Sequence, residues 1–347
     1  MNVDEILAEA VARHASDLHL TVDAPPSFRI HGEIVRGESA LLTQSDTRRA
    51  FESLSGRRER TALDERGQVN FSYSIPGMGR FRVSAFRQRG SVALAIRILW
   101  PKVPTLGELC LPLAAAELAM RPGGLVLVAG PTGSGKSSTL AGMIDLINDS
   151  RSCHVITLED PIEYLHSHKQ SIVHQREIGQ DAPSFDEGLR AALRQDPDVI
   201  MVGDIGDTET IQAALTAAET GHLVLGALHA TGAQQSVSRI MDVFPPHRQQ
   251  QVRVQVAEVL AGVIAQQLVP RIDRPGRIVA CEILVATPAV RSLIRENRTH
   301  QLASAIQTGA KLGMRTMSQS LRDLCDKHVI SVEEYQSRSA SAPEREY

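Results

Sequence analysis

The feature that most constrains the fold of this 347-residue chain is the segment Gly130-Pro-Thr-Gly-Ser-Gly-Lys-Ser137. It satisfies the phosphate-binding pattern G-x-x-x-x-G-K-[ST] at every fixed position. The apolar run Leu125–Ala129 precedes it and predicts a strand, and Leu140, Ile144 and Ile147 recur after it at helical spacing. A strand, a glycine-rich loop and a helix in this order are the context that the motif needs, so we expect the chain to bind a nucleoside triphosphate.

The residue types in this loop match the chemistry of a phosphate site. The glycines let backbone N–H groups turn toward a phosphate, and the N-terminus of the following helix adds a favourable dipole. Lys136 is expected to reach the β and γ phosphates, and the hydroxyl of Ser137 is expected to bind Mg²⁺. The residues predicted to contact the nucleotide are Gly130, Pro131, Thr132, Gly133, Ser134, Gly135, Lys136, Ser137 and Ser138.

Composition narrows the class of protein. Hydrophobic residues make up 42% of the chain and charged residues 22%, which is typical of a soluble globular protein. No apolar run approaches the roughly 20 residues of a membrane-spanning helix, and the acidic N-terminus does not resemble a signal peptide. The four cysteines lie far apart, which argues against a zinc module and fits a reducing cytoplasm. A net charge of −3 and 3% aromatic residues argue against a nucleic-acid partner.

The pattern of strands and helices predicts two domains. Residues 1–100 read as a small α+β domain, with a helix over 3–14 and strands at 17–21, 27–31, 69–73, 80–87 and 92–98. The proline-containing stretch up to residue 109 reads as a linker. Strands and helices then alternate through residues 110–280, which predicts a RecA-like α/β core with a largely parallel sheet. From about residue 245 onward the pattern is mostly helical, residues 281–335 are expected to form a helical C-terminal region, and the polar tail 336–347 is expected to be disordered.

Two acidic clusters follow predicted strands of the second domain. Glu159 and Glu163 come after the strand 154–158, where carboxylates can hold Mg²⁺ waters or orient an attacking water; the alternative is a solvated acidic loop. Asp204 follows four apolar residues, as in a Walker B strand beside the Mg²⁺–phosphate site. Its alternative is a capping role, and Asp207 or Thr208 could equally cap the next helix.

Two histidines bracket the strand predicted at 222–226. His229 is expected at the carboxyl end of this strand, where the nucleotide phosphates lie, and is a candidate γ-phosphate sensor. His222 is added to the predicted nucleotide-binding residues. A purely structural role is the alternative for both.

Together these clusters resemble the secretion ATPase superfamily, and most closely its type IV pilus retraction (PilT-like) ATPases. The resemblance covers nearly the whole chain, and its segments are 15–20, 80–86, 156–163, 175–177, 189–198, 217–229, 289–296 and 304–309. It implies ATP as the nucleotide. It also implies a cytoplasmic homohexamer that works at an inner-membrane pilus platform protein, possibly beside a paralogous pilus ATPase.

The resemblance further implies a PAS-like N-terminal domain that packs on the RecA-like domain of a neighbouring subunit. ATP then lies between the two, and arginines of the first domain reach the neighbour's phosphates. Arg82 and Arg97 match this role best, with Arg80 a weaker choice, and neutralisation of γ-phosphate charge is the expected contribution. Ion pairing with surface acids is the alternative.

The chain departs from the family's pattern after the Walker B strand. Asp204 stands where the family has glutamate, and Gly206 stands where it has arginine. The shorter side chain withdraws the carboxylate by about 1 Å, a misplacement that can cost on the order of 10²-fold in rate. The main hypothesis is therefore a ring ATPase that drives pilus retraction, and the alternative is a nucleotide-binding accessory subunit with low turnover. An assembly or type II secretion ATPase and a DNA translocase rank below both.

Overall fold

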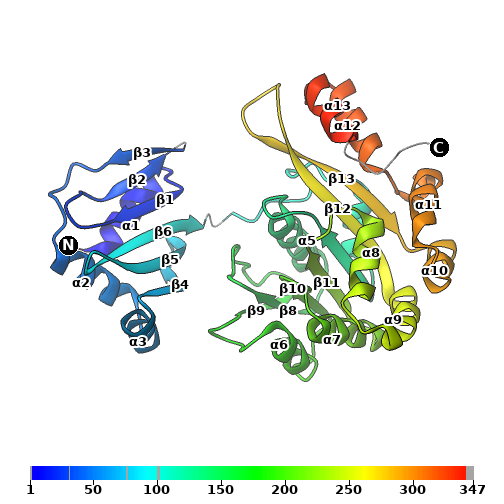
Figure 1. Ribbon diagram of the computed structural model, residues 1–347, viewed down its shortest axis with the longest axis horizontal. Coiled ribbons are helices and arrows are strands. Elements are labelled where there is room, and N and C mark those ends of the chain that lie inside the picture. The colour runs from blue at the N-terminus through cyan, green and yellow to red at the C-terminus, as the bar shows by residue number, and fades with distance from the viewer. Residues whose placement is uncertain (1, 31, 76, 100–101, 341–347) are drawn as a thin grey trace. The chain divides into compact units, whose positions relative to one another are not determined.

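The computed structural model describes residues 2–30, 32–75, 77–99 and 102–340. The chain divides into two compact units (Figure 1). One comprises the residues up to Lys102 together with Glu163–Leu165, and the other comprises Val103–Ile162 and the chain from His166 onward. No helix in these ranges is long and apolar enough to cross a membrane.

The first unit is an antiparallel sheet of strand order β3-β2-β1-β6-β5-β4, with three helices that share its core. Its elements are α1 (Val3–Ala12), β1 (Asp17–Leu20), β2 (Ser27–Ile30), β3 (Glu33–Arg36), α2 (Gln44–Leu54), α3 (Arg57–Arg66), β4 (Gln68–Ile75), β5 (Gly79–Gln88) and β6 (Ser91–Leu99). The strands alternate as a half-buried sheet requires: Phe81 and Val83 of β5 are buried, whereas Arg82 between them is exposed. The five predicted strands are present, while β3, α2 and α3 were not predicted.

The second unit is built on a seven-stranded sheet of order β13-β12-β7-β11-β10-β8-β9. All neighbouring strands are parallel except β12 and β13, which form an antiparallel hairpin. The strands are β7 (Gly124–Ala129), β8 (His154–Glu159), β9 (Ile172–Glu177), β10 (Val199–Val202), β11 (Leu223–Leu228), β12 (Leu260–Pro270) and β13 (Arg277–Val285). The helices are α4 (Leu113–Ala119), α5 (Lys136–Ser150), α6 (Phe185–Ala192), α7 (Thr208–Glu219), α8 (Ala233–Asp242), α9 (Pro246–Val259), α10 (Pro288–Arg295), α11 (Leu302–Thr308), α12 (Met317–Asp326) and α13 (Val332–Ala340), with short 3-10 turns at Thr299–Gln301 and Ala310–Leu312.

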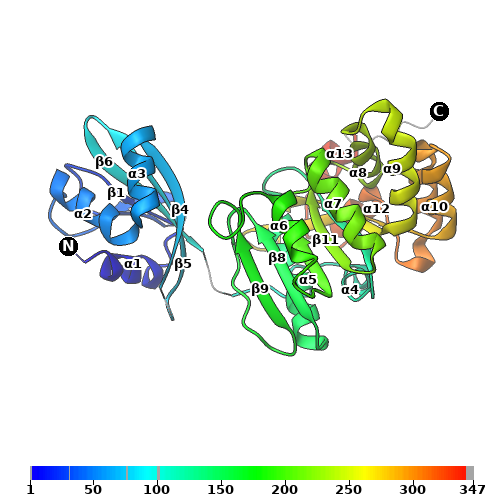
Figure 2. The ribbon, with the colours of Figure 1, turned by 90° about the horizontal axis from the view of Figure 1, so that it is seen from below.

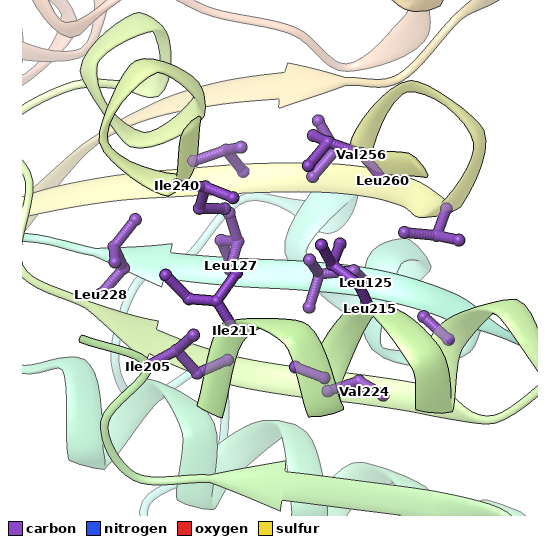
Figure 3. Packing of buried hydrophobic residues seen from close by; sticks show 14 of the residues in the cluster. Leu125, Leu127, Ile205, Ile211, Leu215, Val224, Leu228, Ile240, Val256 and Leu260 are labelled. Carbon is purple, nitrogen blue, oxygen red and sulfur yellow. The ribbon is translucent and has the colours of Figure 1, made fainter. Parts of the chain in front are cut away.

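Both faces of this sheet are buried, which explains why its central strands are apolar at every position. Leu125 and Leu127 of β7 point toward α7, α8 and α9, where they pack with Leu215 and Ile240 (Figure 3). Val126, between them, belongs to the cluster that packs with α4 and α5 on the other face. Figure 2 shows these helices disposed about the strands of the second unit. The predicted α/β architecture is therefore confirmed.

The main difference from the prediction lies after residue 245, where we expected mostly helix. Instead, β12 follows α9 directly and pairs with β13 over nine residue pairs. The continuous apolar run Leu260–Ala265 has no breaker before it, and such a run reads equally well as buried helix or buried strand. The tail also differs: α13 continues through residues 336–340, while 341–347 lie outside the described residues.

One buried histidine of the second unit gives this fold a predicted pH dependence. Burial lowers the pKa of His166 to about 4, and its Nδ1 has no hydrogen-bond partner among the described residues. Between this pKa and about 6.5, the unfolded chain binds a proton that the folded chain does not. The free energy of unfolding should therefore fall as the pH is lowered through this window, by on the order of 2–3 kcal/mol.

The check is thermal or urea unfolding of the protein and of His166→Leu between pH 4 and 7. The His166→Leu profile should be flatter across this window. His247→Leu is the matched control, because His247 is exposed and its replacement should leave the slope unchanged. Parallel profiles for the protein and His166→Leu would contradict the prediction.

Candidate functional site

The register of the parallel strands brings the predicted site segments to one edge of the sheet. Ala129 at the end of β7 pairs with Leu228 at the end of β11. Val202 at the end of β10 lies between Gly226 and Leu158 of its two neighbours. The residues that follow these strand ends are the phosphate-binding loop, His229, Asp204 and the loop after Glu159. Open α/β sheets bind their ligands at such carboxyl edges.

The phosphate-binding loop has the conformation that its glycines predict. Gly133 and Gly135 have φ angles of +78° and +92°, in the left-handed region that favours glycine. A Cβ atom at Gly130 would lie 2.6 Å from the backbone oxygen of Gln266, so only glycine fits there. Lys136 Nζ donates to the carbonyl oxygens of Gly130 and Pro131, at 2.9 and 3.1 Å. Its ammonium group thus lies over the loop itself, where a phosphate would bind.

Gln266 of β12 contacts the phosphate-binding loop, a contact that the sequence did not reveal. Its side chain is 2% exposed and lies beside the phosphate-binding loop. Its Nε2 donates to the backbone oxygen of Ser134 at 2.8 Å, and its Oε1 accepts from Thr139 Oγ1 at 2.9 Å. One buried amide therefore joins the loop to the first turns of α5. No local pattern predicts this contact, because 127 residues separate Gln266 from Thr139.

Replacing Thr139 with valine should loosen this connection. Valine has nearly the same shape but no hydroxyl, so Gln266 Oε1 would be left buried without its donor. We expect a loss of about 1–3 kcal/mol in the free energy of unfolding and a higher KM for the nucleotide. The control is Thr216→Val on α7, whose exposed hydroxyl donates to the carbonyl of Gln212 in its own helix. Urea unfolding gives the free energy of unfolding of both variants, and steady-state kinetics give the KM for the nucleotide. Equal effects of the two substitutions would contradict the prediction.

The Mg²⁺ predicted for this site fits the residues present. Asp204 Oδ1 is buried and has no hydrogen-bond partner within the described parts of the chain. Ser137 is exposed in the first turn of α5. A carboxylate and a hydroxyl beside phosphate oxygens form the all-oxygen environment that Mg²⁺ prefers. The neighbouring Asp207 caps α7 by accepting from Thr210 N at 2.7 Å, so the alternative capping role falls to Asp207 and not to Asp204.

The two glutamates of the other acidic cluster have different environments. Glu159 is 9% exposed, and its Oε1 accepts from Thr157 Oγ1 at 2.7 Å and from Gln175 Nε2 at 3.0 Å. Glu163 is exposed in the loop between β8 and β9. The carboxylate of Glu159 is therefore held inside the unit, whereas that of Glu163 can meet a ligand.

The two histidines lie at opposite ends of β11. His229 is exposed directly after β11, at the edge of the phosphate-binding loop. His222 precedes β11, where its carbonyl accepts from Gly124 N and its Nδ1 lies 2.9 Å from the oxygen of Ala217. The prediction that His222 binds nucleotide is therefore corrected: His222 does not lie at the phosphate-binding loop of its own chain, because the whole length of β11 separates His222 from that loop.

The predicted arginines lie on the outward face of the first unit's sheet. Arg82 and Arg97 are paired neighbours on β5 and β6, and Arg97 also pairs with Asp17 of β1. Arg97 Nε donates to Asp17 Oδ1 at 3.0 Å, with its side chain 64% exposed. Burial raises the pKa of Asp17, but the hydrogen bond from Ser16 and the ion pair with Arg97 together lower it below its ordinary value. An exposed pair of this kind contributes about 0–1 kcal/mol, so Arg97 can exchange partners readily.

A cavity of about 450 Å³ adjoins the phosphate-binding loop. The start of α5 forms one side, and the β12–β13 hairpin forms another. The lining includes the apolar side chains of Leu268 and Ile278 and the guanidinium groups of Arg271 and Arg277. The lining is therefore mixed, because Glu108 and Arg274 also border the cavity.

Comparison with known proteins agrees with this arrangement. The family described as Type II/IV secretion system protein matches residues 1–337. The chain belongs to this family. Among curated relatives, this Type II/IV secretion system protein is 43% identical to the type IV pilus retractation ATPase PilT of Pseudomonas aeruginosa, over 99% of each chain. It is 44% identical to a twitching motility protein of Neisseria gonorrhoeae, over 91% of this chain and 85% of the relative.

A solved structure of the pilus retraction motor PilT with bound ADP superposes with a TM-score of 0.92. Its sequence is 46% identical, and the match covers 99% of this chain and 98% of that one. The family resemblance inferred from the sequence motifs is thereby confirmed.

Proposed function

We propose that this chain is an ATP-hydrolysing motor that powers type IV pilus retraction. The observation that carries the proposal is the meeting of a complete phosphate-binding loop, Asp204 and His229 at one sheet edge. The near full-length similarity to PilT supports pilus retraction as the process served.

In this proposal ATP binds with its phosphates on the backbone N–H groups of the loop from Gly130 to Gly135. Lys136 exchanges the carbonyl oxygens that it now contacts for phosphate oxygens, a stronger charge-assisted interaction. The base and ribose occupy the neighbouring cavity, where Leu268 and Ile278 offer apolar surface. Ser137 and Asp204 would hold Mg²⁺, which would supply positive charge that offsets the negative charge of the phosphates.

Hydrolysis is assigned to residues at the same edge. The exposed carboxylate of Glu163 orients the attacking water, and His229 senses the γ-phosphate. We propose a homohexamer in which Arg82 and Arg97, on the PAS-like first unit, contact the phosphates of a neighbouring subunit and stabilise the charge that develops there. The motor would act in the cytoplasm at the inner membrane, through a pilus platform protein and beside a paralogous pilus ATPase where one is present, with no nucleic acid involved.

The test is complementation of a deletion strain. Deletion should abolish twitching and leave excess surface pili, and this chain should restore motility whereas its Lys136→Ala variant should not. Loss of all surface pili on deletion would contradict retraction and indicate assembly.

A second candidate, an accessory subunit with low turnover, is favoured by Asp204 and Gly206. A Cβ atom at Gly206 would lie 3.5 Å from Asp204 Oδ2, an ordinary contact distance, so a side chain at position 206 would lie beside this carboxylate. Steady-state phosphate release by the purified hexamer separates the two candidates. Turnover no higher than that of Lys136→Ala would support the accessory role.

A further inference from the structure

The loop that carries Glu163 is held on both sides by side chains of a single strand. Glu177 of β9 accepts from the backbone N–H of Ile162, with its Oε2 at 3.1 Å. Gln175, two residues earlier on β9, accepts from the backbone N–H of His166, with its Oε1 at 2.9 Å. Ile162 and His166, the residues on either side of the segment Glu163–Leu165, are therefore both bonded to β9.

These two anchors are themselves oriented by buried groups. Gln175 Nε2 donates to Glu159 Oε1 at 3.0 Å, which points its oxygen toward His166 N. Thr157 Oγ1 donates to the same carboxylate oxygen at 2.7 Å. Thr157 and Glu159 pair in register with Gln175 and Glu177 across β8 and β9, so all four side chains share one face of the sheet.

The anchor at Glu177 is the more deeply buried of the two. Glu177 is 4% exposed, and its Oε1 accepts from Gln180 Nε2 at 2.8 Å. Buried, hydrogen-bonded carboxylates hold their geometry firmly, because breaking such a bond leaves a desolvated charged group without its partner. A water-orienting group requires this kind of fixed support, since a misplacement of about 1 Å can cost on the order of 10²-fold in rate.

We propose that Gln175 and Glu177 are positioning residues for the carboxylate of Glu163, with Glu159 as the group that orients Gln175. This inference rests on the role proposed above for Glu163. It also gives Glu159 a different function from the one predicted from the sequence: it supports the loop from inside the unit and does not meet the substrate.

The test shortens each anchor by one methylene while keeping its chemical group. Glu177→Asp and Gln175→Asn should each lower kcat about tenfold and leave the KM for ATP within about twofold, because the phosphate-binding loop is untouched. Glu177→Gln keeps the length and an oxygen for Ile162 N, and should retain most of the activity. The matched control is Gln180→Asn, since Gln180 is exposed and bonds Glu177 but not the loop backbone.

The same substitutions in a Glu163→Gln background distinguish positioning from general damage. Groups that act through Glu163 should cause little further loss once Glu163 is gone, because their effects are then not additive. An undiminished tenfold loss in that background would overturn the proposal, as would wild-type kcat in both shortened variants. A rise in the KM for ATP equal to the fall in kcat would overturn it as well.

A separate result would show that Glu163 does not orient the attacking water. If Glu163→Gln alone keeps wild-type kcat, the role assigned to Glu163 is wrong. If Glu177→Asp fails to bind ADP or unfolds at a much lower temperature, Gln175→Asn alone provides the comparison of kcat with and without Glu163→Gln. Gln175 is partly exposed, so its replacement should disturb the fold less.

Discussion

Replacing Lys136 with alanine should reduce ATP hydrolysis by about 10²–10³-fold, the usual cost of removing one group that stabilises transition-state charge. The ammonium group of Lys136 already lies over the loop, where the carbonyl oxygens of Gly130 and Pro131 hold it. Alanine leaves the helix intact, because it is the best helix former, but removes the only charge that the loop itself supplies. Nucleotide affinity should fall together with turnover.

Phosphate release and equilibrium binding of ADP are the two measurements. Lys169→Ala is the matched control in the same unit, since Lys169 forms ion pairs with Asp145 and Asp149 at the surface. It should leave both quantities within about twofold, as expected of an exposed pair. A Lys136→Ala protein that keeps a tenth of the normal turnover would contradict the assigned role.

If Asp204 faces Mg²⁺ as proposed, replacing it with asparagine should lower kcat by about 10²-fold, because the side chain keeps its shape but loses its negative charge. The buried Oδ1 of Asp204 has no hydrogen-bond partner in the described ranges, so this oxygen is available to a ligand. Asp207→Asn is the matched control. It removes a carboxylate three residues away whose function, capping α7, asparagine performs equally well.

The reverse substitution tests the departure of this chain from its family. Asp204→Glu extends the carboxylate by about 1 Å and should raise kcat, by up to about tenfold, if the short side chain limits the rate. Steady-state phosphate release at saturating ATP measures both variants. No gain for Asp204→Glu would show that the shorter carboxylate already reaches its ligand, and that residue 204 does not account for any low turnover.

The fold was predictable where a single pattern decided the structure. Alternation identified the strands of the first unit except β3, whose residues are all exposed, and apolar runs that ended at turn signals identified β7, β8, β10 and β11. The β12–β13 hairpin was missed because Leu260–Ala265 continues from α9 without a breaker, and only pairing with β7 and β13 makes this run a strand. Where a segment is buried on both faces, its residues are apolar whether it forms a helix or a strand, so secondary-structure propensity does not distinguish the two.

The sequence by itself determined the phosphate-binding loop, because its ligands are consecutive residues and their geometry follows from local glycines and the start of α5. It also determined the family, through many ordered motifs. Only the tertiary structure decided which of the predicted site residues lie close to the phosphate-binding loop. The strand register put His229 at the loop and His222 at the far edge, and burial separated Glu159 from Glu163. Gln266 reached the loop across 132 residues, since contacts between distant segments depend on the sheet that joins them and leave no local pattern.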